Sequence, residues 1–77
     1  MSYKLLETVV LNRDAPESGL RKGDLGAVVH VHGPGCYEVE FVTAAGETAS
    51  LVELSDSDLR PVEGTDLVTV RSVRKSG

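Results

Sequence analysis

Four residues in the middle of the chain have side chains that could bind a metal ion: His30, His32, Cys36 and Glu38. Imidazole, thiolate and carboxylate groups are the ligands that zinc takes in proteins. The segments that carry them alternate apolar and polar residues, so a β-hairpin would present all four on one outer face. The spacing matches no standard zinc motif, however, and strand alternation by itself places polar groups outside. The sequence therefore favours a solvated hairpin, with these four residues as the candidate metal ligands.

The register of this hairpin decides which of its side chains meet. Strands are expected over residues 27–32 and 36–42, joined by Gly33-Pro34-Gly35. A three-residue loop pairs His32 with Cys36 on the outer face, and it sets every inward residue against an inward residue: Val31 with Tyr37, Val29 with Val39 and Ala27 with Phe41. A two-residue loop would set apolar residues against polar ones. Because a slip of one residue moves an entire face, the sequence predicts the three-residue register.

The same residues could also support nucleophilic catalysis, with Cys36 as the nucleophile and His32 as its base. Such a site needs an oxyanion hole and a third group that orients the base, and the sequence indicates neither. A chain of 77 residues also has little room for a pocket that excludes water. We therefore expect no enzymatic activity, no catalytic residues and no cofactor.

The charge balance bears on the choice of partner. The chain has 8 Lys and Arg against 12 Asp and Glu, for a formal net charge of −4. Nucleic-acid-binding proteins usually show a basic footprint, and here cations cluster only at Arg71, Arg74 and Lys75, which we interpret as a solvated end. We therefore expect no nucleic-acid partner.

The cysteine content and the hydropathy pattern bear on the location of the protein. One cysteine cannot form an intrachain disulfide, so no disulfide framework is expected. No run approaches the roughly 20 apolar residues of a membrane span. The N-terminal residues also lack the features of a signal peptide. The sequence therefore predicts a cytoplasmic protein with no membrane association.

The acidic residues offer a second kind of candidate site. Glu38, Glu40, Glu47 and Glu53 are the candidate partner-binding residues, and two aspartates follow at Asp56 and Asp58. They are interpreted first as a dispersed, solvated surface. The functional alternative is a surface that meets a basic protein, because complementary charge speeds encounter and selects the partner.

The remaining elements must position these side chains. Strands are expected over residues 5–11 and 48–54, a short helical turn over residues 55–59, and a closing strand over residues 60–62. Gly26 indicates a bulge or a close backbone approach. The pattern predicts an all-β fold, a small SH3-like barrel of about five antiparallel strands with one short 3-10 turn before the last strand. Residues 1–62 form this domain, and residues 63–77 form a tail that is an extra strand, a partner-seeking arm or disordered.

Several segments resemble a family of small bacterial proteins described as domain of unknown function 4926: KLLETVVL (residues 4–11), GLRKGDLGAVV (19–29), YEVEFV (37–42), the turn at Gly46 and LRPV (59–62). The resemblance covers roughly residues 4–62. It implies the SH3-like fold and a bacterial cytoplasmic setting, without an established activity. Since genes for such small proteins often lie beside toxin-like or nuclease-like genes, it also suggests an antitoxin or immunity role.

We therefore expect a small, non-enzymatic protein-interaction module, with an antitoxin or immunity-type accessory role as the finer hypothesis. The alternative is a module associated with the transcription or translation machinery, because residues 22–29 resemble the KOW element. KOW domains that touch RNA are usually basic, whereas this chain is acidic. A weak homodimer formed through the C-terminal tail is a further expectation, since an unplaced strand can add to the edge of a neighbour.

Overall fold

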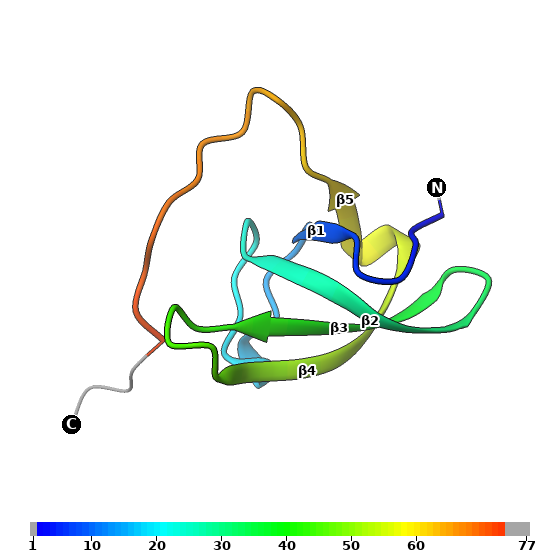
Figure 1. The fold of residues 1–77 in the computed structure, drawn as a ribbon, viewed down its shortest axis with the longest axis horizontal. Coiled ribbons are helices and arrows are strands. Elements are labelled where there is room, and N and C mark those ends of the chain that lie inside the picture. Colours follow the sequence, from blue (N-terminus) through cyan, green and yellow to red (C-terminus); the bar gives the residue numbers. More distant parts are fainter. Residues whose placement is uncertain (1, 74–77) are drawn as a thin grey trace.

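The computed structural model describes residues 2–73, and its regular structure consists of one antiparallel sheet and two short 3-10 turns. Five strands form the sheet in the order β4-β3-β2-β1-β5: β1 (Thr8–Leu11), β2 (Leu25–Gly33), β3 (Cys36–Val42), β4 (Thr48–Ser55) and β5 (Leu59–Pro61). Figure 1 shows the three long strands β2, β3 and β4 side by side, with β1 and β5 above them. The prediction of an all-β fold with five antiparallel strands is confirmed.

The predicted 3-10 turn before the last strand is present as η2 (Asp56–Asp58). A capping box lies at the N-terminus of this turn. The backbone N–H of Ser55 donates to the Asp58 carboxylate, and the Ser55 side chain accepts from the backbone N–H of Asp58. A second turn, η1 (Pro16–Ser18), forms where the sequence predicted an irregular loop. Proline at its first position fixes a helical φ, and Gly19 ends the turn with a φ of 73°.

The first strand is shorter than predicted, because residues 5–7 do not extend it. Leu6 has a φ of 70°, which interrupts the strand, and its backbone N–H donates to the carbonyl of Val28. Leu5 and Leu6 are 59% and 74% exposed, although their apolar side chains suggested a strand that faces the core. At the other end, β5 covers Leu59–Pro61 instead of residues 60–62.

The predicted register of the β2–β3 hairpin is wrong at both ends. Gly33, not His32, lies opposite Cys36, so the loop has two residues. The predicted partnership of Val31 with Tyr37 is present, but further along Val28 replaces Val29 as the partner of Val39, and Ala27 lies opposite Glu40. Two shifts in β2, between Val28 and His30 and between Val31 and Gly33, change which face each residue presents, as β-bulges do.

The bulges also reverse the predicted inner face of β2. Gly26 and Val28 are buried, whereas Val31 is 41% exposed. Ala27 and Val29 are only half-buried. The alternation of Ala27, Val29 and Val31 predicted that these residues face the core. A bulge cannot be recognised from sequence within a short run of valines, so the change of face was not predicted.

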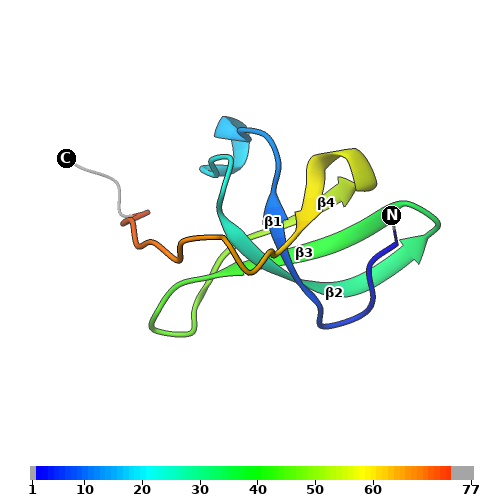
Figure 2. The same ribbon diagram turned by 90° about the horizontal axis from the view of Figure 1, so that it is seen from above.

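The core is aliphatic with three aromatic rings, as the composition predicts. It lies between the long strands and β1, which crosses them at a steep angle in Figure 2. The Tyr3 and Tyr37 rings meet edge to face with centroids 5.4 Å apart, and the Tyr3 backbone N–H donates to the Tyr37 hydroxyl at 3.2 Å. These contacts fix the N-terminal segment against the hairpin. The buried cluster comprises Tyr3, Val9, Leu11, Ala15, Leu20, Val28, Tyr37, Val39, Phe41, Leu54 and Leu59.

The tail leaves β5 and arches back across the molecule toward the β3–β4 turn (Figure 1). Its described part, residues 63–73, contains no strand, so a further strand within the same sheet is not formed there. Residues 74–77 of the predicted tail lie outside the described residues.

Candidate functional site

The four candidate metal ligands do not converge. Glu38 lies opposite His30 in the ladder, but its carboxylate oxygen is 3.3 Å from the Nε2 of His32. The Cys36 thiol donates instead to Glu53 on β4, at 3.2 Å. The bulge near His32 accounts for this, because it removes His32 from its predicted place opposite Cys36. Among residues 2–73, no three His, Cys, Asp or Glu side chains lie close enough to hold a metal ion together.

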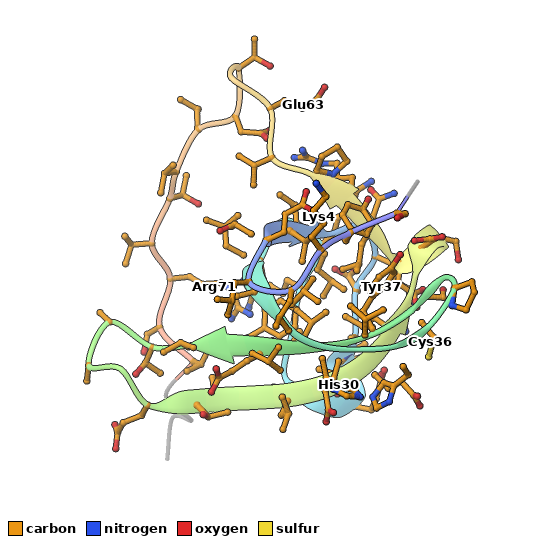
Figure 3. All side chains as sticks on the ribbon, turned by 45° about the vertical axis from the view of Figure 1, so that its right-hand side comes forward. Lys4, His30, Cys36, Tyr37, Glu63 and Arg71 are labelled. Carbon is orange, nitrogen blue, oxygen red and sulfur yellow. The ribbon has the colours of Figure 1, made fainter. Side chains whose placement is uncertain are left out.

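The Cys36 thiol is held in its neutral form. The Glu53 carboxylate that accepts its hydrogen bond raises the pKa of the thiol above its ordinary value, and burial adds to the shift. Since the thiolate is the nucleophile, this environment weakens the reactivity of the sulfur. Figure 3 shows Cys36 and His30 on the hairpin, and the two imidazole rings of His30 and His32 contact each other with centroids 4.5 Å apart.

The predicted partner-binding glutamates do gather on one side of the sheet. Glu38 and Glu40 alternate with the buried side chains of β3, and Glu53 alternates with Val52 and Leu54 on β4, so these three point outward. Glu47 lies in the turn that joins the two strands. We call the outward side of β3 and β4, with this turn, the acidic face: Glu38, Glu40, Glu47 and Glu53.

The strands that form the acidic face supply no Lys or Arg to balance its charge. Residues 25–59 include no Lys and no Arg. Glu38 and Glu53 lie directly opposite each other in the β3–β4 ladder. Like charges in that position destabilise a sheet, so the arrangement costs stability by roughly a few tenths to 1 kcal/mol.

Neutral and weakly basic groups orient the carboxylates on this face. The Thr48 hydroxyl donates to Glu40, the Cys36 thiol donates to Glu53, and His32 contacts Glu38. These contacts hold the side chains in place, and neither the hydroxyl nor the thiol neutralises the carboxylate it binds. The acidic face is therefore an ordered anionic surface.

Three of the described arginines form close ion pairs away from the acidic face. Arg13 pairs with Asp58 at 2.8 Å, so this aspartate belongs to an ion pair and not to the acidic face. Asp56 is partly buried, and its Oδ1 has no hydrogen-bond partner. The other two pairs hold the tail.

Two ion pairs that sequence reasoning missed fasten the tail to the body. Arg60 on β5 binds Asp66 through both of its terminal nitrogens, at 2.9 and 2.8 Å. Arg71 donates its Nε–H to Asp24 at 2.9 Å and contacts the carbonyl of Gly19. Arg71 and Asp24 are 47 positions apart, so no local pattern could reveal their pairing.

The Arg60–Asp66 ion pair changes the pKa of Asp66, which a titration can test. The Arg60 guanidinium, with the backbone N–H of Glu63, lowers the pKa of Asp66 to about 2. In the unfolded chain the pKa of this carboxyl is about 4. Because the folded protein lowers that pKa, the Asp66 carboxylate stabilises the fold at pH values above about 4, and this stabilisation is lost as the pH falls toward 2. We expect Arg60→Gln to raise the pKa of Asp66 toward its ordinary value, as followed by the carboxyl carbon signal in NMR. An unchanged Asp66 titration in this variant would show that the ion pair does not form in solution.

Between the tail and the body lies a hollow of about 1000 Å³ that is open to solvent. Apolar side chains of both contribute to its lining, including Val10, Leu25, Val42 and Val62 from the body. Val10 is 3% exposed although it lies outside the core cluster, whereas the other three are 43–50% exposed, so most of this apolar patch is open to solvent.

Comparison with known proteins gives a family. The model of the family described as "Domain of unknown function (DUF4926)" matches residues 5–61. No curated protein and no solved structure matches this chain, so the assignment to the SH3-like barrels stays a prediction. In the described residues no helix is long and apolar enough to cross a membrane. Because the match covers well over half of the sequence, the chain belongs to the DUF4926 family.

Proposed function

We propose that this protein is a non-enzymatic interaction module that binds a basic surface of a partner protein through its acidic face. The observation that carries the proposal is the row of outward glutamates on β3 and β4 within a segment that has no Lys or Arg. Clustered charge of one sign steers an oppositely charged partner and raises the association rate.

The cost of this arrangement supports a binding role. A lysine in place of Glu53 would relieve the repulsion with Glu38 and make a favourable cross-strand pair. The chain has glutamates at both positions instead: the Cys36 thiol donates to Glu53, and His32 contacts Glu38. A surface required only for solubility does not need two opposed carboxylates.

A non-enzymatic role is consistent with the state of the most reactive side chain. Cys36 is engaged with Glu53, and the raised pKa of its thiol opposes thiolate chemistry. The finer hypothesis, an antitoxin or immunity-type accessory protein of the bacterial cytoplasm, comes from the family resemblance. An acidic face that blocks a basic, nucleic-acid-binding surface fits that role.

The test is capture of partners from a nuclease-treated lysate of the source cell with three forms of the protein. The first is the wild type, and the second is Glu40→Lys with Glu53→Lys on the acidic face. The third is Glu17→Lys with Glu63→Lys, two glutamates that are 66% exposed and lie away from that face. Both double variants change the net charge by the same amount, so they separate the position of the charge from its total.

We expect one stoichiometric protein partner on the wild type and on the control variant, and its loss from the acidic-face variant. Equal capture by all three forms would contradict the proposal. Ribosomal or polymerase components captured from a parallel untreated lysate, and absent after nuclease treatment, would instead favour the KOW-like alternative.

A further inference from the structure

The segment Leu67–Val70 of the tail, which we call the arm, has the composition of a β-strand but no strand partner. Its three apolar side chains Leu67, Val68 and Val70 are 89%, 80% and 98% exposed. None of the backbone hydrogen bonds found between described residues involves the arm. Unpaired strand-like backbone of this kind readily pairs with an open sheet edge.

Ion pairs at both ends hold the arm away from the body. Asp66, immediately before the arm, binds Arg60, and Arg71, immediately after it, binds Asp24. The hollow described above separates the arm from the sheet. The arm is therefore fixed in place with its backbone exposed, which reduces the ordering cost of pairing with another strand.

The sheet offers a long open edge at β4. This strand is the outermost in the order β4-β3-β2-β1-β5, and it has eight residues, Thr48–Ser55. It contains none of the lysines or prolines that commonly block edge strands, and Leu51 on it is 54% exposed. The opposite edge, β5, has three residues and ends in a proline, so it is a poor acceptor.

We propose that the arm of one molecule adds as a strand to the β4 edge of a second copy, and that the reciprocal contact closes a twofold dimer. Strand alternation places Val68 and Val70 on one face, where they would extend the core side of the sheet beside Val52. The other face of the arm, Leu67 and Thr69, would lie on the outward side of the sheet beside Glu53.

Charge complementarity favours a second copy as the occupant. The arm is followed in sequence by Arg71, Arg74 and Lys75, whereas β4 and the strand beside it have glutamates and no Lys or Arg. Association of two copies therefore brings a basic segment to an acidic edge. The inference does not rest on the proposed function, since it needs no other protein, but it places the arm beside Glu53, at the border of the acidic face.

Sedimentation of the full chain over a concentration series tests the dimer. We expect a monomer–dimer equilibrium in which Thr69→Pro raises the dissociation constant by roughly tenfold or more, because proline removes a backbone donor from the arm. Thr69→Ala keeps that donor and should leave the constant unchanged. A wild-type monomer at every concentration, or a dimer indifferent to Thr69→Pro, would overturn the proposal.

Hydrogen exchange at low and high protein concentration locates the acceptor. We expect amides of Thr48–Ser55 and of the arm to gain protection together in the wild type, and to remain unprotected in Thr69→Pro. Concentration-dependent protection at β5 or within the hollow, with β4 unchanged, would refute the β4 edge as the acceptor.

Discussion

Tyr37→Ala is expected to remove a large part of the protein's free energy of unfolding. The Tyr37 side chain is 2% exposed and is among the largest fully buried side chains. Replacement of a buried aromatic ring by a methyl group costs about 3–5 kcal/mol. A domain of this length has a total stability of about 4–12 kcal/mol. Urea unfolding followed by circular dichroism measures the loss.

Tyr37→Phe separates the ring from its hydroxyl. The phenylalanine keeps the edge-to-face contact with Tyr3 and loses the hydroxyl, which accepts from the Tyr3 N–H and interacts with Asp56. We expect a loss of about 1 kcal/mol for this variant. If Tyr37→Ala cost no more than Tyr37→Phe, the ring would not be the packing centre that the structure describes.

Gly26→Ala is expected to be the second most damaging change, although it adds one methyl group. A Cβ at this position would lie 2.6 Å from Val39 Cγ1, 2.9 Å from Phe41 Cε2 and 3.1 Å from the carbonyl oxygen of Glu40. Val39 and Phe41 are 0% and 3% exposed, so neither can move aside. Overpacking of this kind costs about 1–3 kcal/mol, a decrease of about 1–2 M in the urea midpoint.

Gly64→Ala is the matched control for this prediction. A Cβ at Gly64 meets nothing within 4 Å, and its φ lies outside the left-handed region. The same chemical change should therefore leave the urea midpoint unchanged. Equal midpoints for the two alanine variants would contradict the close approach of β2 and β3 at Gly26.

The parts of the fold that could be predicted are those with a strong local pattern. The alternation Tyr37, Val39, Phe41 predicted β3 with its observed bounds and its inner face. The run of Ser and Asp residues before Leu59 predicted the 3-10 turn η2, because such residues cap one another over short distances. Gly26 was identified as a close backbone approach, and the structure places it against Val39.

The parts that could not be predicted depend on contacts distant in sequence. The bulges of β2 lie within consecutive valines and histidines, where either face satisfies the pattern, so the predicted register was wrong and the four candidate ligands do not come together. The turn at Leu6 requires a positive φ at a leucine, which no propensity indicates. The ion pair between Arg71 and Asp24 joins the tail to a turn 47 positions away.

The sequence predicted the residues of the acidic face, but it did not predict how they are arranged. The sequence shows the glutamates and the missing cations, and it predicts that Glu38 and Glu40 point outward. Only the β3–β4 register shows that Glu53 lies opposite Glu38. The repulsion between these two carboxylates lowers the stability of the fold, and we interpret this cost as support for a role in binding.

The central claim is tested most directly by the rate at which the captured partner associates with the protein as ionic strength is raised. We expect the wild type and the Glu17→Lys, Glu63→Lys control to associate at the same rate, with a steep decrease as salt screens the charges. Glu40→Lys with Glu53→Lys should associate at least roughly tenfold more slowly at low salt. Equal rates and equal salt dependence for the two double variants would show that the acidic face does not receive the partner.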